Sequence, residues 1–236
     1  MADLSPDAAA ATEQQPGGYD LIVQQLVPGY ASLARLAVAL LAASPQAGRR
    51  GASVLVAGCG TGAELLEARA QRPDWQLWAI DPSAAMLAEA QRRLAGAGDG
   101  ASIHWQRTTV EDLDADGSFE GALSVLVLQS LADDGSKLAF LSALARSLRP
   151  GGQLVLVDLM APERSPLQQQ VEAAWLGFQS ASGVDAAAAA VSGLTQGVHP
   201  IGQSRLAALV EAAGFSDPAP IFQALNVCGF LLQKLP

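Results

Sequence analysis

The chain has 236 residues, of which 50% are hydrophobic and 16% are charged, and its formal net charge is −9. This length is enough for one large domain with a sizeable core. The acidic balance argues against a polyanionic partner, because phosphate binding draws on clustered Lys and Arg, so no nucleic-acid partner is expected.

The first 17 residues are rich in Ala, Gln and Pro and short of branched apolar residues, which predicts a disordered leader. They lack the basic start and apolar block of a secretory signal. No stretch reaches the length of an uncharged membrane span. We therefore expect a cytoplasmic protein without a membrane attachment.

Two apolar segments precede the first strand. Residues 19–27 have apolar positions at mixed helical spacing and end at Pro28-Gly29. Residues 31–43 are apolar nearly all round, with Arg35 as the only charge. This second segment is expected to form a helix packed against a sheet.

The run from Val54 to Ala57 predicts a buried parallel strand, since it leaves no polar face for water. It is followed by Gly58, Gly60 and Gly62 and by a helical segment, residues 63–70. Glycines allow left-handed backbone and close approach of a ligand, and a helix N-terminus offers free N–H groups. Together they predict a nucleotide-type site.

A second strand, residues 75–80, ends at Asp81, nineteen positions after Gly62. In a doubly wound sheet, a carboxylate at this place can accept the ribose hydroxyls of an adenosine. The glycine turn and Asp81 therefore favour a cofactor that contains a nucleoside.

The chain then alternates between helices and strands, which predicts a parallel sheet with right-handed crossovers. Ser83 is the expected N-cap of a helix that ends near Leu94. The later elements are expected at 102–106 (strand), 122–128 (buried strand), 136–148 (helix) and 154–159 (strand).

Residues 162–201 depart from this rhythm and predict two helices, broken near Gly183 and Gly193; the run Ala186–Ala190 has the highest helix propensity available. An insertion here would lie over the C-terminal edge of the sheet, as a substrate lid or as a packing element. A helix at 204–213 and two strands, 220–225 and 227–233, joined at Asn226 complete the chain.

The glycine spacing, and the acid of Asp81-Pro82 followed by a helix with Met86-Leu87, resemble the class I S-adenosylmethionine (SAM) dependent methyltransferases. Residues 149–158 and 209–215 also resemble this family. The resemblance implies an α/β fold for residues 18–236, which would form a single methyltransferase domain. Its Rossmann-like, doubly wound, seven-stranded sheet would have an antiparallel last strand and a helical insertion after the fifth strand.

The resemblance also implies SAM as cofactor and a small-molecule methyl acceptor. Residues 107–113 fall where the family holds the adenine ring, and an acid often stands at the place of Thr109. Backbone groups of Thr109 and Val110, or Asp112, would serve instead. The cofactor-binding residues expected on this basis are Tyr30, Gly58, Cys59, Gly60, Gly62, Asp81, Pro82, Met86, Thr109, Val110, Val125 and Gln129.

One branch of the family looks most similar. Tyr19-Asp20, Pro28-Gly29-Tyr30 and residues 222–226 resemble the carboxy-S-adenosyl-L-methionine (carboxy-SAM) synthases that serve tRNA uridine modification.

There are three departures from that branch. Val56 replaces the motif I acid, Val125 replaces an Asn, and Leu209 replaces the Arg that holds the extra carboxylate. We interpret the chain as a relative that uses ordinary SAM; Arg205, four residues before Leu209, is the one candidate to replace that Arg.

Methyl transfer from a sulfonium needs positioning and no metal, and two histidines supply no metal-ligand spacing. A catalytic base is needed only if the acceptor must lose a proton. His199 is the candidate for this base, and Tyr19 is a candidate hydrogen-bond donor that faces the substrate, although structural roles remain open for both. His104, beside Trp105 in a strand, is expected in the core.

Three alternatives remain. A carboxy-SAM synthase is the second interpretation within the enzymes. A non-catalytic SAM-binding protein is suggested only by Val56. A nicotinamide-dependent oxidoreductase would need the third glycine one position later and a hydride-transfer partner such as a Tyr-Lys pair, and neither is present.

Overall fold

A computed structural model describes residues 16–96, 102–162, 164–184 and 197–236 of the chain. Its seven strands form one sheet in the order β3-β2-β1-β4-β5-β7-β6. The strands are β1 (Ser53–Ala57), β2 (Gln76–Ile80), β3 (Ser102–Gln106), β4 (Phe119–Val125), β5 (Leu148–Leu159), β6 (Ala219–Ala224) and β7 (Val227–Gln233). Strands β1 to β5 pair in parallel, and β7 is antiparallel to both β5 and β6. The predicted seven-stranded sheet with an antiparallel last strand is confirmed.

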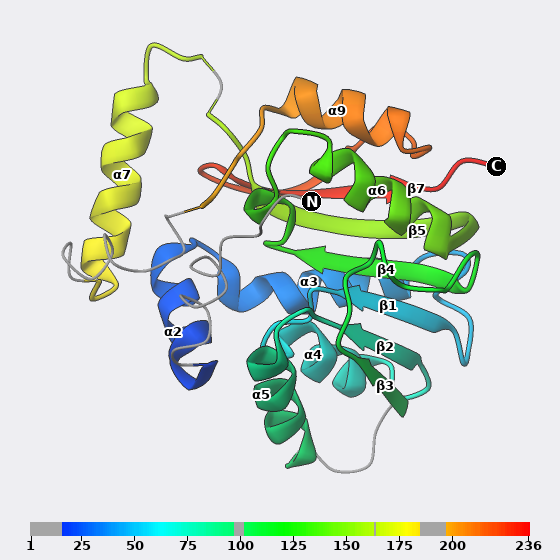
Figure 1. Ribbon diagram of the computed structural model, residues 1–236. Helices are drawn as coiled ribbons and strands as arrows, with labels where there is room; N and C mark the ends of the chain where they lie inside the picture. Colours follow the sequence, from blue (N-terminus) through cyan, green and yellow to red (C-terminus); the bar gives the residue numbers. More distant parts are fainter. Residues whose placement is uncertain (1–15, 97–101, 163, 185–196) are drawn as a thin grey trace, which may run out of the picture.

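Helices cover both faces of this sheet (Figure 1). On one face lie α6 (Ser136–Ser147) and α9 (Gln203–Ala212), and on the other lie α3 (Tyr30–Ala42), α4 (Ala63–Gln71) and α5 (Ala84–Ala95). The remaining helices are α2 (Pro16–Leu26), the short 3-10 helix η1 (Leu128–Ser130) and α7 (Gln168–Ala181). The fold thus has the three layers of a doubly wound protein.

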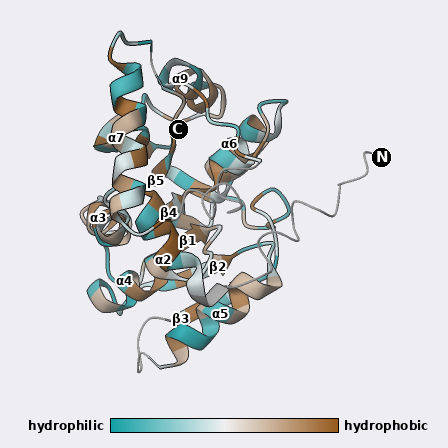
Figure 2. Ribbon diagram, turned by 90° about the vertical axis from the view of Figure 1, so that its left-hand side faces the viewer, coloured by the Kyte–Doolittle hydropathy of each residue, from teal (hydrophilic) through white to brown (hydrophobic). Residues whose placement is uncertain are grey.

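The core lies on both faces of the central strands. Alternate residues of β1 enter different clusters, with Leu55 facing α6 and α9, and Val54 and Val56 facing α3 and α4. The residues of β1 from Val54 to Ala57 are at most 2% exposed, which explains their unbroken apolar run. In Figure 2 these central strands are brown, and the helices around them carry teal segments.

Three predicted boundaries are wrong. β4 ends at Val125 rather than at residue 128, because Leu126 has a left-handed φ of 57° and Leu128 begins η1. β5 starts at Leu148 rather than at residue 154, since Leu148 already pairs with Phe119 before a register shift. α2 begins at Pro16, inside the predicted leader; residues 1–15 lie outside the described residues.

α7 supplies the first helix of the predicted insertion. It ends at Ala181, and Gly183 adopts a φ of 87°, which suits a glycine after a helix C-terminus. The Trp175 indole N–H donates to the Leu26 carbonyl at 2.7 Å, so α7 is tied to the end of α2. Figure 1 shows both helices beyond the carboxyl ends of the parallel strands. The Ala186–Ala190 run and Gly193 lie outside the described residues.

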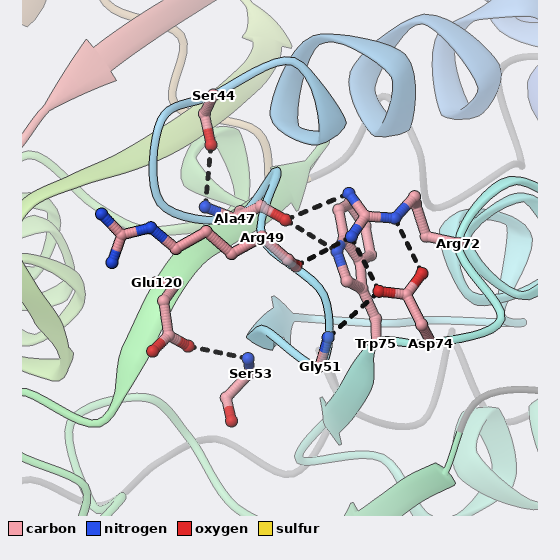
Figure 3. A network of polar contacts seen from close by, with 9 residues as sticks. All are labelled: Ser44, Ala47, Arg49, Gly51, Ser53, Arg72, Asp74, Trp75 and Glu120. Carbon is pink, nitrogen blue, oxygen red and sulfur yellow. Dashed lines mark hydrogen bonds and ion pairs between the residues drawn. The ribbon is translucent and has the colours of Figure 1, made fainter.

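The opposite edge of the sheet, where the parallel strands begin, is fixed by a polar network (Figure 3). The Arg72 guanidinium binds the Asp74 carboxylate at 2.8 and 2.9 Å and donates to the carbonyls of Ala47 and Arg49. The Trp75 indole also donates to Ala47 O, at 2.8 Å. These bonds join the segment before β1 to the segment before β2.

Among the described residues, no single helix has the length and apolar character to cross a membrane. Residues Gly18–Leu26 and Tyr30–Ala42 reach that length only as a pair, bent by 95° at the break between them.

Candidate cofactor site

The three glycines after β1 form a tight turn at the carboxyl edge of the sheet. Gly58, Gly60 and Gly62 have φ values of 70°, 48° and 86°, which residues with a side chain rarely adopt. A Cβ atom at Gly60 would meet nothing within 4 Å, whereas one at Gly58 would overlap Val127 at 2.5 Å. The turn therefore needs glycine for its shape at Gly58 and leaves open space for a ligand beside Gly60.

The Asp81 carboxylate joins this turn to the next helix. Its Oδ2 accepts from Gly60 N at 2.9 Å and its Oδ1 from Ser83 N at 2.8 Å. Asp81 is 8% exposed, and burial raises the pKa of its carboxyl although both hydrogen bonds act to lower it. Ser83 caps α5 as predicted, since its Oγ accepts from Met86 N at 3.3 Å. Each Asp81 oxygen keeps accepting capacity for a ribose hydroxyl.

A small cavity of about 30 Å³ lies between the glycine turn, the end of β4 and the two N-terminal helices. A cavity of this size has room for only a few water molecules. The cavity is lined by Tyr19, Tyr30, Gly58, Cys59, Gly60, Thr61, Ala63, Glu64, Val125 and Leu126. A larger, open hollow of about 510 Å³ beside Pro162 and Gln168 contains none of these groups.

Both tyrosines predicted at the site line this cavity. Burial, followed by the negative charge of Glu64, raises the pKa of Tyr19 to about 12 and that of Tyr30 well above its usual range. Both phenols are therefore protonated at neutral pH. Tyr19 can orient a ligand by hydrogen bonding, but it is poorly suited to remove a proton.

Helix α2 is held over the glycine turn by Asp20. The Thr61 hydroxyl donates to Asp20 Oδ1 at 2.6 Å, and Arg93 of α5 forms an ion pair with Asp20 Oδ2. Arg93 also donates to the Thr61 carbonyl at 2.8 Å. The cavity is therefore closed on the side of α2 by three linked groups.

The residues predicted around the adenine ring lie outside the cavity lining. Met86 and Val110 are 6% and 3% exposed, and Pro82 is exposed. Thr109 Oγ1 donates to Asp112 Oδ2 at 3.0 Å, so these two side chains fix the loop after β3. Gly62, the N-cap of α4, packs against α5, where a Cβ would be 3.1 Å from Ala90.

Gln129 and His199 meet through their backbones. His199 N donates to Gln129 O at 2.6 Å, and Gln129 N donates to Asp158 Oδ1 at 3.0 Å. Gln129 Oε1 and Asp158 Oδ2 are buried without a hydrogen-bond partner among the residues that the structure describes. Burial raises the pKa of Asp158 to about 7. The His199 side chain is exposed, and neither His199 nor Gln129 is part of the cavity lining.

His104 is the one aromatic prediction that is wrong. It is exposed and stacks on Trp78, with ring centroids 4.8 Å apart. The reason is that β3 is an edge strand, and residues 107–118, which lead to β4, form no helix to cover this face.

Four lining residues were not predicted from the sequence: Thr61, Ala63, Glu64 and Leu126. Glu64 is the most notable of them, since its carboxylate is in the first turn of α4 and the residue is only 6% exposed. Acids are common at exposed positions in the first turn of a helix, so the sequence offered no signal that this one is buried.

The seven-stranded sheet, with a three-glycine turn after β1 and an acid at the end of β2, has the fold of a class I methyltransferase. Comparison with known proteins agrees. Residues 54–152 match the family described as the methyltransferase domain. The magnesium protoporphyrin IX methyltransferase from Synechocystis, solved with bound SAM, aligns with a TM-score of 0.63 and 16% identity over 99% of both chains.

Two curated proteins are similar in sequence. An uncharacterized protein from Synechococcus sp. is 37% identical over 131 residues, which cover 55% of this chain and 30% of that protein. The carboxy-SAM synthase of Campylobacter hominis is 24% identical over 218 residues, 92% of this chain and 90% of the synthase. The chain thus spans less than a third of the first relative. Residues 54–152 thus match the methyltransferase domain, and the fold of the chain is that of the class I SAM-dependent methyltransferases.

Proposed function

We propose that the protein transfers a methyl group from SAM to a small-molecule acceptor. The observation that carries this proposal is the link between Asp81 and Gly60, because it places a ribose-binding carboxylate directly against the glycine turn. When bound, SAM supplies an electrophilic methyl group on a sulfonium. The protein contributes by binding, orienting and excluding water.

The residues fit this cofactor in chemistry. Gly60 leaves open space for close approach, Asp81 has capacity for ribose hydroxyls, and Glu64 offers a buried negative charge to a cationic ligand. The cavity is smaller than the cofactor, so we infer that Tyr19 and Tyr30 shift outward with their helices when SAM binds.

A small acceptor is supported by the net charge of −9, which is unfavourable for nucleic acid. It is supported also by the structural neighbour named as a methyltransferase of magnesium protoporphyrin IX. Helix α7 lies at the carboxyl edge and is a candidate lid over the acceptor, with Trp175 and Phe178 half-buried on it. Neither His199 nor Tyr19 is well placed as a base, so we favour an acceptor that needs no proton removal.

Thermal unfolding in the presence of SAM, S-adenosylhomocysteine (SAH) or NADH tests the cofactor. At about 100 times Kd, SAM and SAH are each expected to add roughly 2.7 kcal/mol, or about 5–10 °C for a chain of this size. A shift with NADH alone would contradict the proposal. Methyl transfer to a panel of small acceptors, with tRNA and duplex DNA as competitors, tests the acceptor class.

A carboxy-SAM synthase is the second candidate, favoured by the similarity over 92% of the chain. Two observations count against it. Leu209 is 3% exposed within the core, and Arg205 is engaged at the surface by Asp133, with bonds of 2.9 and 3.0 Å. A second carboxylate on the cofactor would then be desolvated without a cation.

Mass spectrometry of small molecules released from denatured, freshly purified protein separates the two candidates. We expect SAM or SAH and no carboxy-SAM. Carboxy-SAM in the extract, lost in Arg205→Ala, would instead establish the synthase and assign Arg205 as its carboxylate clamp.

A further inference from the structure

Glu64 is a buried acid that no other part of the fold explains. It follows the glycine turn by two residues, is 6% exposed and lines the cavity beside Tyr19 and Tyr30. Among the residues that the structure describes, no Lys, Arg or His forms an ion pair with it. A carboxylate that is removed from water without a counter-charge is costly, so its burial needs a reason.

The charged and titratable groups around Glu64 do not neutralise it. Tyr19 of α2 and Tyr30 of α3 are neutral phenols at physiological pH. Asp20 of α2 is a second acid, and Arg93 of α5, the cation that acts on Glu64, is already paired with Asp20. Burial raises the pKa of Glu64 to about 7 and Asp20 raises it further, whereas a hydrogen bond from its own backbone N–H and the charge of Arg93 lower it. Within the described part of the chain, this negative site therefore has no cation of its own.

Glu64 lies near a position at which the family has an acid and this chain does not. Val56, in the middle of the buried strand β1, is 2% exposed and stands where the family has its motif I acid. Val56 packs in the core and does not line the cavity, whereas Glu64, in the first turn of α4 after the glycine turn, places a carboxylate in the cavity lining. Because the proposed function assigns the ribose to Asp81, which is not part of the cavity lining, the cavity is the part of the site that is left for the methionine end of the cofactor.

We propose that Glu64 pairs with the positive charge at the methionine end of SAM and replaces the acid that is absent at Val56. The inference rests on SAM binding as proposed above. Two groups of SAM carry that positive charge, the ammonium and the sulfonium; SAH keeps only the ammonium. The pair forms only when cofactor is bound, which explains why the carboxylate forms no ion pair within the described protein.

The test is isothermal titration calorimetry of the full chain with SAM and with SAH at pH 7, in two buffers that differ in ionisation enthalpy. Glu64→Gln keeps the shape of the side chain and removes its charge. Glu67→Gln is the matched control, because Glu67 is on the same helix but pairs outward with Arg35. Because a hydrogen bond to a charged group is lost, we expect SAM to bind about 10- to 150-fold more weakly to Glu64→Gln. The control should bind SAM as tightly as the wild type.

Proton release gives a second readout that a structural role would not move. With a pKa of about 7, roughly half of Glu64 is protonated at pH 7, so pairing with a cation releases about half a proton per SAM bound. The release is expected in the wild type and in Glu67→Gln and is expected to vanish in Glu64→Gln. Equal weakening of SAM and SAH would assign the ammonium as the partner; weakening of SAM alone would assign the sulfonium.

Unchanged affinity and unchanged proton release in Glu64→Gln, with a folded variant by circular dichroism, would overturn the inference and leave the proposed function intact. Absence of SAM and SAH binding in the wild type would overturn the proposed function together with the inference.

Discussion

At the scale of single residues, Asp81 serves the fold and the cofactor at once. Asp81→Ala removes the acceptor for Gly60 N and Ser83 N as well as the proposed ribose ligand. We expect about 10- to 150-fold weaker binding of SAM and SAH, together with a lower melting temperature. Calorimetry and thermal unfolding measure the two effects.

The matched control is Ser83→Ala, which removes only the helix cap. It should cost roughly 1 kcal/mol of stability and leave cofactor affinity unchanged. An Asp81→Ala variant that behaves in the same way would show that the carboxylate is a cap and not a cofactor ligand.

Glu64 predicts a pH dependence of stability in the absence of cofactor. Its pKa in the folded protein is about 7, above the ordinary value of 4.5, so the folded state holds this proton when the unfolded chain has lost it. The stabilising contribution is present below about pH 4.5 and is lost as the pH rises to about 7. As the pH rises through this window, the free energy of unfolding of Glu64→Gln should therefore increase relative to that of the wild type, by on the order of 3 kcal/mol at pH 8.

Denaturant unfolding at pH 4.5, 6, 7 and 8 measures this gain, with Glu67→Gln as the control whose difference from the wild type should not follow the pH. A constant difference between Glu64→Gln and wild type across the range would contradict the assignment of the buried charge.

At this scale, the sequence was informative where a local conformation or hydrogen bond requires a particular residue type. Positive φ values require glycine, so Gly58, Gly60 and Gly62 were informative, and the Ser83 cap follows from local hydrogen bonding. Glu64 was missed because its burial depends on α2 and α3, which pack over it from distant parts of the chain. His104 was misplaced because periodicity does not show that a strand lies at an edge.

At the scale of elements, α2 is the part that we expect to move when the cofactor enters the cavity, because it carries Tyr19 of the cavity lining. Asp20→Asn removes the ion pair with Arg93 and keeps an oxygen for Thr61. A partly exposed pair of this kind contributes up to about 1 kcal/mol, so opening should become up to about fivefold more frequent. We expect the association and dissociation rates of SAM to rise together.

Stopped-flow tryptophan fluorescence can follow this opening, because the Trp175 indole bonds to the end of α2. Arg35→Gln, which breaks an exposed ion pair between α3 and α4, is the control and should leave both rates unchanged. Unaltered rates in Asp20→Asn would mean that α2 does not limit access.

Element type was predictable from periodicity, whereas several boundaries were not. The left-handed backbone at Leu126 ends β4 within an apolar run that is typical of a strand, and a leucine gives no local sign of such a conformation. β5 extends backward to Leu148 because it pairs with β4 there, despite Pro150 and two glycines. Long-range pairing decides where β5 begins.

At the scale of the molecule, the carboxyl ends of the parallel strands carry the candidate site, whereas their amino ends carry the Arg72 network that stabilises the fold. A variant at Arg72 tests whether these two roles are separate. Arg72→Ala removes hydrogen bonds to Asp74, Ala47 and Arg49 at the edge opposite the cofactor site (Figure 3). We expect a loss of roughly 2 kcal/mol, or about 4–8 °C in melting temperature, with the Kd for SAM unchanged within about twofold. A large loss of affinity would show that the edges are coupled.

The class of fold was predictable because alternating helices and apolar strands leave few other arrangements. The order of the strands in the sheet does not follow from the same pattern. β7 lies between β5 and β6 although it follows both in the chain, and only the family resemblance implied that the last strand is antiparallel. Periodicity identifies strands but does not say which of them become neighbours.

The network around Arg72 also affects how such a protein can evolve a new substrate specificity. New acceptors would be accommodated by substitutions at the carboxyl edge, and most substitutions destabilise. Hydrogen bonds at the amino edge lie away from the cofactor site, so they can be strengthened without altering specificity. One example is the bond that Glu120 accepts from Ser53 N at 2.7 Å. Directed evolution toward a new substrate should therefore begin from variants reinforced at the amino edge, which provide a reserve of stability for change at the site.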